Sequence, residues 1–135
     1  MTLCDAGPLV ALIDPNEATH ALCRQSLPKM SLPLSITWPC CTEAMYLLYK
    51  ARGHLAQDQL SDLIESGLLG IRETPVSEQK AMRRLMEKYR DTPMDLADAS
   101  IVAAAEATGI RRIFTLDSDF RIYRLSDGSA FEVVP

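Results

Sequence analysis

The chain has 135 residues, of which 47% are hydrophobic and 24% are charged, and its formal net charge is −4. This length and composition fit one globular domain with a sizeable core, so we expect a single domain over residues 1–135. The negative charge excludes nucleic-acid binding through bulk positive charge. Nucleic-acid binding remains compatible with this charge if some of the 18 acidic residues bind divalent cations, because the bound cations would offset the negative charge locally.

The first half of the chain alternates short apolar runs with segments whose apolar residues recur at helical spacing. Gly7-Pro8 opens a helix after the first strand, because proline is tolerated in the first helical turn. Trp38-Pro39 is interpreted as a bend, and Gly53 as the end of the helix that follows it. We expect strands over residues 2–4, 32–37 and 68–73, and helices over residues 7–13, 18–27, 42–52 and 56–66.

The second half continues the same alternation. Ser77 is expected to cap a helix, and Gly109 stands where a helix ends in left-handed backbone. Asp117-Ser118-Asp119 is interpreted as a turn. We expect helices over residues 77–89 and 95–108, a loop over residues 91–93, and strands over residues 113–116 and 131–134, the last of them at an edge.

Strands that alternate with helices predict parallel pairing, with helices on both faces of the sheet. We therefore expect an α/β fold, a three-layer α/β/α sandwich with a central, mainly parallel sheet. No linker, repeat or low-complexity stretch indicates a second domain.

Cysteine usage and hydropathy indicate the compartment. The cysteines form no Cys-x-x-Cys pair and have no histidine at zinc-finger spacing, so we expect free, mostly buried thiols in a reducing environment. The N-terminus has no basic segment leading into an apolar run, and no stretch approaches ~18 uninterrupted apolar residues. The sequence therefore predicts a cytoplasmic protein without a signal peptide or a membrane span. The cysteines are Cys4, Cys23, Cys40 and Cys41.

Acidic side chains stand near the carboxyl ends of the predicted strands, where ligands bind in open α/β sheets. Asp5 follows the first strand, Asp117 follows the strand over residues 113–116, and Glu43 lies in the first turn of the helix after the second strand. Asp98 lies inside a predicted helix beside an apolar stripe, where a carboxylate is costly unless it is paired or metal-bound. Clustered carboxylates cannot stay charged together without a cation, which favours a divalent metal site.

Each acid also has a purely structural interpretation. Asp5 would cap its helix, Glu43 would stabilise a helix start, and Asp117 would shape a turn. Asp95 is expected to be the N-cap of its own helix. Asp98 has the weakest structural explanation, since aspartate has no propensity reason to lie in a helix interior. The joint placement of the acids favours the metal site.

Several strings in chain order carry a resemblance to a known family. They are Asp5-Ala6-Gly7-Pro8-Leu9-Val10-Ala11-Leu12-Ile13, Thr42-Glu43, Asp95-Leu96-Ala97-Asp98-Ala99-Ser100-Ile101-Val102 and Thr115-Leu116-Asp117-Ser118-Asp119-Phe120. With them the chain resembles the PIN-domain family, and specifically its VapC-like toxin ribonucleases, over nearly its whole length. The resemblance implies a compact α/β/α fold whose carboxylates bind Mg²⁺ or Mn²⁺ and hydrolyse RNA phosphodiester bonds.

The resemblance also implies roles for individual residues. The protein would be a metal-dependent endoribonuclease, the toxin of a type II toxin–antitoxin pair, whose carboxylates hold one or two metal ions that orient and deprotonate a water. Thr115 and Thr42 are candidates for supporting hydroxyls. The implied catalytic and metal-binding residues are Asp5, Glu43, Asp98 and Asp117, with Asp119 as a further metal ligand and Asp95 as a neighbour.

The partners that the resemblance implies are an RNA substrate, a small antitoxin that blocks the acidic pocket, and a second copy in a homodimer. The apolar helix faces at residues 44–48 and 60–64 are candidates for the dimer contact, and they are equally compatible with the core. A non-catalytic PIN-like module that binds a protein or RNA remains an alternative, as does a phosphatase or small nucleotide-binding protein, although no glycine-rich phosphate loop supports the latter. Several basic residues are candidates for phosphate contacts, although most of them form solvated helix faces. They are Lys50, Arg52, Lys80, Arg83, Arg84 and Lys88.

Overall fold

Five parallel strands form the centre of the molecule in the computed structural model, which describes residues 1–135. The strand order is β3-β2-β1-β4-β5, and every neighbouring pair is parallel. The predicted parallel sheet is therefore confirmed, and the last strand lies at an edge as expected. The strands are β1 (Thr2–Cys4), β2 (Leu34–Thr37), β3 (Leu69–Arg72), β4 (Arg112–Phe114) and β5 (Glu132–Val134).

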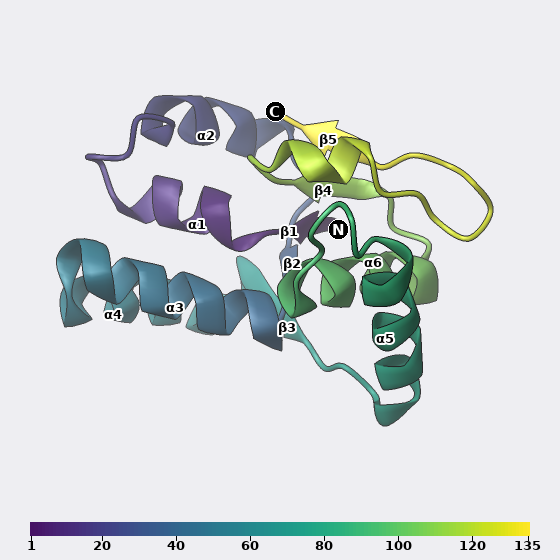
Figure 1. Ribbon diagram of the computed structural model, residues 1–135. Helices are drawn as coiled ribbons and strands as arrows, with labels where there is room; N and C mark the ends of the chain where they lie inside the picture. The colour runs from purple at the N-terminus through teal and green to yellow at the C-terminus, as the bar shows by residue number, and fades with distance from the viewer.

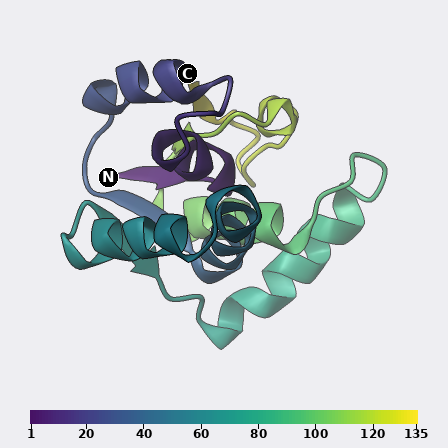
Figure 2. The same cartoon turned by 90° about the vertical axis from the view of Figure 1, so that its left-hand side faces the viewer.

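Helices cover both faces of this sheet. The α-helices are α1 (Ala6–Ile13), α2 (His20–Ser26), α3 (Trp38–Arg52), α4 (His54–Glu65), α5 (Gln79–Lys88) and α6 (Leu96–Thr108), and the short 3-10 helices are η1 (Leu27–Lys29), η2 (Val76–Glu78) and η3 (Ser118–Arg121). The crossovers from β1 to β2 and from β2 to β3 advance in one direction along the sheet, and the crossover from β3 to β4 returns. Right-handed connections then place α1 to α4 on one face and α5 and α6 on the other. Figure 1 shows these two groups to the left and right of the sheet, and Figure 2 views the α1 side. This is the predicted three-layer sandwich.

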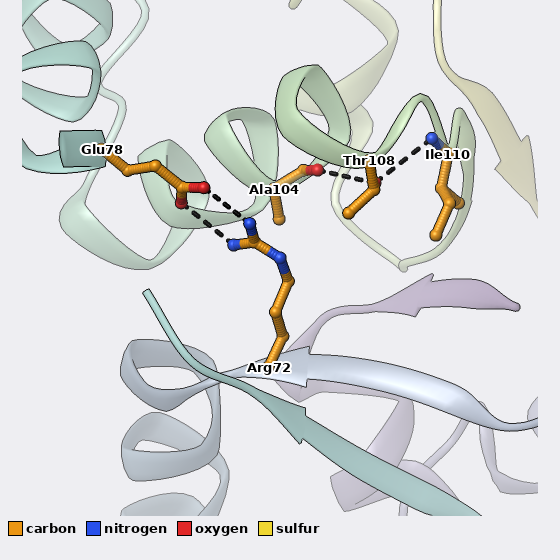
Figure 3. Close-up of polar contacts among 5 residues, drawn as sticks. All are labelled: Arg72, Glu78, Ala104, Thr108 and Ile110. Carbon is orange, nitrogen blue, oxygen red and sulfur yellow. Dashed lines mark hydrogen bonds and ion pairs between the residues drawn. The ribbon is translucent and has the colours of Figure 1, made fainter. Parts of the chain in front are cut away.

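Helix α6 is the most deeply buried helix of the fold. Its buried residues run without interruption from Ala97 to Ala105, because the helix contacts β2, α3 and α5. Small alanine side chains allow these neighbours to approach closely. The helix ends at Gly109 with φ 76°, as predicted, and the Thr108 hydroxyl donates to the carbonyl of Ala104 at 2.7 Å (Figure 3). The burial of its first turn places Asp98 inside the molecule.

Helix α3 begins earlier than the sequence predicts. The interpretation of Trp38-Pro39 as a bend is wrong, because both residues belong to the first turn of the helix. Proline is tolerated there, since the first amide groups of a helix have no partner within the helix. Glu43 consequently lies in the second turn of α3 rather than in its first. The expected end of the helix at Gly53 is confirmed, with φ 74°.

The two apolar faces considered for a dimer contact are divided between the core and the surface. Ala44, Leu48 and Leu60 are fully buried, because α3 and α4 pack against each other through them. Tyr46 and Leu47 are exposed, so a dimer contact at residues 44–48 stays a prediction for these two side chains. All four cysteines are buried and free, as expected. No helix combines the length and the apolar character needed to cross a membrane.

A buried ion pair fixes the connection from β3 to α5. Arg72, the last residue of β3, donates from Nη1 to Glu78 Oε2 at 3.0 Å and from Nη2 to Glu78 Oε1 at 2.6 Å (Figure 3). Such bidentate pairs hold both side chains in one relative orientation. The expected cap at Ser77 is wrong, because Ser77 lies within η2 and α5 begins at Gln79 without a side-chain cap. The Arg72–Glu78 pair, rather than a cap, anchors the start of α5.

Candidate functional site

Asp5 connects the end of β1 to the start of α1. Its amide donates to the carbonyl of Phe114 at 3.0 Å, which extends the pairing with β4 by one residue. Its Oδ1 caps α1 by accepting from the amide of Ala6 at 2.8 Å, so the N-cap interpretation is confirmed. Its Oδ2 accepts from the hydroxyl of Thr115 at 2.9 Å. Two hydrogen bonds therefore orient a carboxylate that is only 8% exposed.

Thr115 joins Asp5 to the next acid of the site. It follows β4 directly and is buried. While its hydroxyl donates to Asp5, it also accepts from the amide of Asp117 at 3.0 Å. Asp117 Oδ1 in turn accepts from the amide of Asp119 at 2.9 Å and caps η3, so the expected turn-forming role is confirmed. One hydroxyl thus sets the relative positions of two carboxylates that are far apart in sequence.

Asp98 enters the site from the first turn of α6. It forms a capping box with Asp95, whose Oδ1 accepts from the Asp98 amide at 2.8 Å while Asp98 Oδ2 accepts from the Asp95 amide at 3.4 Å. The Tyr123 hydroxyl also donates to Asp98 Oδ2, at 3.2 Å. The expectation that Asp98 has no structural reason for its position is wrong, because it stands at a capping position and not in the helix interior.

These carboxylates converge at the carboxyl edge of the sheet. One side-chain oxygen from each of Asp5, Asp98 and Asp117 lies within 4.8 Å of the corresponding atoms of the other two. We refer to these residues as the three-acid cluster. Each capping hydrogen bond is local to one helix start. The capping bonds therefore explain why an acid stands at each position, but they do not require the three carboxylates to lie close together. The convergence therefore calls for a separate explanation.

Crowding and burial perturb the acid–base behaviour of the cluster. Burial, followed by the negative charges of Asp95 and Asp5, raises the pKa of Asp98 to about 7. Burial also raises the pKa of Asp5, although hydrogen bonds from Ala6 and Thr115 act in the opposite direction. Ionised acids in this arrangement repel one another, so a bound cation would stabilise the folded protein.

Glu43 and Asp119 lie at the margin of the cluster rather than within it. Glu43 is exposed on α3, and partial burial of its carboxyl, followed by the charges of Asp5 and Asp95, raises the pKa of Glu43. Asp119 is half-buried, and its charge adds to the burial that raises the pKa of Tyr123. Both side chains therefore act on the site through their charge.

The donor set of the cluster fits a hard cation. Carboxylate oxygens are the ligands that Mg²⁺ and Mn²⁺ prefer, whereas structural zinc sites use thiolates and imidazoles. Cys40 Sγ lies 3.9 Å from Asp5 Oδ1, but burial raises the pKa of the Cys40 thiol, which stays uncharged and donates. Neither histidine belongs to the cluster.

The sequence interpretation did not identify two residues that contact the site. Tyr123 follows Asp98 by 25 positions, and Cys40 precedes Ala97, whose carbonyl it contacts at 3.6 Å, by 57 positions. No local pattern marks either residue, because each becomes part of the site only through tertiary packing. Of the two hydroxyls considered, Thr115 lies in the site, whereas Thr42 bonds back to the carbonyl of Trp38 and is exposed.

The fold and the cluster define a class of α/β protein with a buried carboxylate site at the carboxyl edge of a parallel sheet. The family model of the PIN domain matches residues 2–125, so the chain belongs to the PIN domain family. The resemblance noted from the sequence is confirmed.

Known proteins are similar to this chain over most or all of their length. The chain is 26% identical to ribonuclease VapC26 of Mycobacterium tuberculosis over 134 residues, which cover 98% of this chain and 99% of that protein. Its fold matches the crystal structure of Mycobacterium tuberculosis VapC20, described as a sarcin–ricin loop cleaving toxin, with a TM-score of 0.85, 17% identity and complete coverage of both chains. It also matches a toxin–antitoxin complex from Klebsiella pneumoniae with a TM-score of 0.66, 19% identity, and coverage of 87% and 88% of the two chains.

Proposed function

We propose that the protein is a metal-dependent endoribonuclease that hydrolyses RNA phosphodiester bonds and serves as the toxin of a toxin–antitoxin pair. The observation that carries the proposal is the three-acid cluster, whose carboxylate oxygens lie within 4.8 Å of one another. Membership of the PIN domain family and similarity to a protein named as a ribonuclease support it.

Asp5, Asp98 and Asp117 would hold the metal, and Mg²⁺ or Mn²⁺ fits their oxygen-only donor set. When bound, such a cation supplies positive charge to the scissile phosphate and lowers the pKa of a coordinated water. Glu43 and Asp119 would accept hydrogen bonds from waters around the site or add a further ligand. These assignments rest on the convergence of the three acids and on the position of the other two at its margin.

The surrounding residues orient the ligands. The Thr115 hydroxyl fixes Asp5 Oδ2, and the Tyr123 hydroxyl fixes Asp98 Oδ2. Burial raises the pKa of the Tyr123 hydroxyl, so it remains a donor at neutral pH and does not compete for the metal. Supporting hydrogen bonds of this kind hold metal ligands in place and tune their affinity. We assign Thr115 and Tyr123 as positioning residues.

Partners follow from the same proposal. The substrate would be RNA, an antitoxin protein would inhibit the enzyme, and the protein would form a homodimer. The similarity to a toxin–antitoxin complex supports the antitoxin. Exposed apolar side chains on α3, two of them within the face at residues 44–48, support self-association. They are Trp38, Tyr46, Leu47 and Tyr49.

The test is cleavage of a panel of structured RNAs, including tRNA, by the purified protein with Mg²⁺ or Mn²⁺. The Asp98→Asn variant removes one charged ligand of the cluster, and Asp58→Asn removes an exposed acid on α4 as a matched control. We expect cleavage by the wild type and the control variant, and none by Asp98→Asn or in EDTA. Full activity of Asp98→Asn would refute the assignment of the site, and wild-type cleavage that persists in EDTA would refute the metal requirement.

A further inference from the structure

A groove with basic walls runs along α5. It has a volume of about 1170 Å³, and Leu96, the first residue of α6, lies at one border. The cations that line it are Lys80, Arg83, Arg84 and Lys88. The groove is distinct from the three-acid cluster, and nothing in the description of the site uses it. We refer to it as the α5 groove.

The charge of the α5 groove is opposite to that of the protein. Helix α5 carries four basic residues and one acidic residue, whereas the whole chain has a net charge of −4. The acidic residue, Glu87, is paired with Arg90 beyond the helix. None of the structure's ion pairs involves Lys80, Arg83 or Arg84. These cations are therefore free to bind an external anion.

The groove lies beside the start of the helix that carries Asp98, because Leu96 lines it and stands two residues before Asp98. Lys88 lies 5.1 Å from the centre of the Tyr89 ring, and Tyr89 packs edge-on against Tyr123 with ring centres 5.0 Å apart. The hydroxyl of Tyr123 donates to Asp98. A chain of side-chain contacts thus joins the last turn of α5 to a proposed metal ligand.

The other end of α5 is held by the Arg72–Glu78 pair (Figure 3). The pair fixes the start of the helix to the end of β3, and it neutralises Glu78, so this carboxylate does not offset the cations that follow it. The packing of α5 on α6 holds the remainder. The helix backbone that carries the cations is therefore held relative to α6 and the cluster before any ligand binds.

We propose that the α5 groove binds the phosphate backbone of the RNA substrate and leads the strand to the three-acid cluster. The inference rests on the proposed ribonuclease function, and it names the surface that holds the RNA outside the reacting centre. Cations without ion-pair partners attract a polyanion by charge, and contacts of this kind read no sequence. It also gives a chain of net negative charge a local surface with affinity for RNA.

The test measures binding without cleavage. The full-length protein is titrated into a short fluorescein-labelled single-stranded RNA in EDTA, and anisotropy is followed between about 50 and 200 mM salt. The variant is Arg83→Gln/Arg84→Gln, and Arg83→Lys/Arg84→Lys retains the charge. Arg24→Gln/Lys29→Gln removes the same charge from exposed positions outside the groove. A thermal melt of each variant establishes that it is folded.

We expect the glutamine variant to bind about tenfold more weakly, and its log–log salt slope to fall by about 1.4, as the loss of two phosphate contacts requires. The lysine variant should bind within about threefold of the wild type, and the Arg24/Lys29 control should bind like the wild type. Unchanged affinity of the folded glutamine variant would overturn the proposal, as would an equal loss in the control. Because no metal is present, this outcome is independent of whether the protein cleaves RNA.

Discussion

Replacing Asp98 with asparagine should abolish RNA cleavage and at the same time stabilise the metal-free protein. Asparagine keeps the size of the side chain and an acceptor for the Tyr123 hydroxyl, but it removes a charge that Asp5 and Asp95 repel. A residue kept only as a helix cap would behave in the opposite way, because its replacement weakens the cap and lowers stability. The sign of the change therefore separates the two explanations of Asp98.

The magnitude follows from the pKa of Asp98. Burial and neighbouring charge raise it from 3.8 to about 7, and each pKa unit corresponds to about 1.36 kcal/mol. The ionised carboxylate thus costs at most roughly 4 kcal/mol of folding free energy above pH 7, and relaxation of the protein and water around the site reduce this figure. After roughly 1 kcal/mol is subtracted for the weakened capping box, we expect a net gain of about 1–3 kcal/mol.

The assay is a thermal or urea melt at about pH 8 in EDTA, where the carboxylate is ionised in the wild type. The gain should raise Tm by about 3–10 °C for a domain of this size. Asp58→Asn, an exposed control, should change stability by less than about 0.5 kcal/mol. Added Mg²⁺ should stabilise the wild type more than Asp98→Asn, since only the wild type retains all three ligands. An Asp98→Asn protein that melts below the wild type in EDTA would refute this reasoning.

Three further predictions test the surroundings of the site. Thr115→Val should weaken Mn²⁺ binding about tenfold, as measured by calorimetry, because Asp5 loses its orienting hydroxyl. Thr115→Ser should retain most of the affinity. Wild-type affinity of the valine variant would contradict this role. The metal-free wild type should become more stable as the pH falls from about 8 to about 5.5. The reason is that Asp98 takes up a proton near pH 7 in the folded state but only near 4 in the unfolded state. A urea midpoint that stays constant or decreases as the pH falls would contradict this prediction. Arg72→Met should destabilise the protein by about 3 kcal/mol in a urea melt, because it leaves Glu78 buried without its partner. A variant as stable as the wild type would show that the pair does not anchor α5.

The layer order of the fold follows from signals that are local in the sequence. The strand over residues 2–4, the end of α3 at Gly53 and the end of α6 at Gly109 were all predictable, because each depends on a short apolar run or on a glycine in left-handed backbone. The prediction of a bend at Trp38-Pro39 was wrong because the same residues are compatible with two local structures. Pro39 is compatible with a bend and with a first helical turn, and only the packing of α3 decides between them.

The acids of the site were predictable in part for the same reason. Asp5 follows β1 and Asp117 follows β4, and these two strands pair in parallel. The convergence of the two carboxylates therefore follows from the topology of the sheet. Tyr123 was not predictable, because its contact with Asp98 depends on how η3 and α6 pack. The burial of Ala44 and Leu48 was equally hidden, since an apolar helix face looks the same whether it meets another helix or another molecule.

The central claim is that Asp5, Asp98 and Asp117 together hold a divalent cation, and anomalous diffraction from crystals soaked in Mn²⁺ tests it most directly. We predict an anomalous peak among the carboxylate oxygens that lie within 4.8 Å of one another, and its loss in crystals of Asp98→Asn. A wild-type map with no peak there at saturating Mn²⁺, or with manganese bound only elsewhere, would contradict the claim and would leave the three acids as helix caps alone.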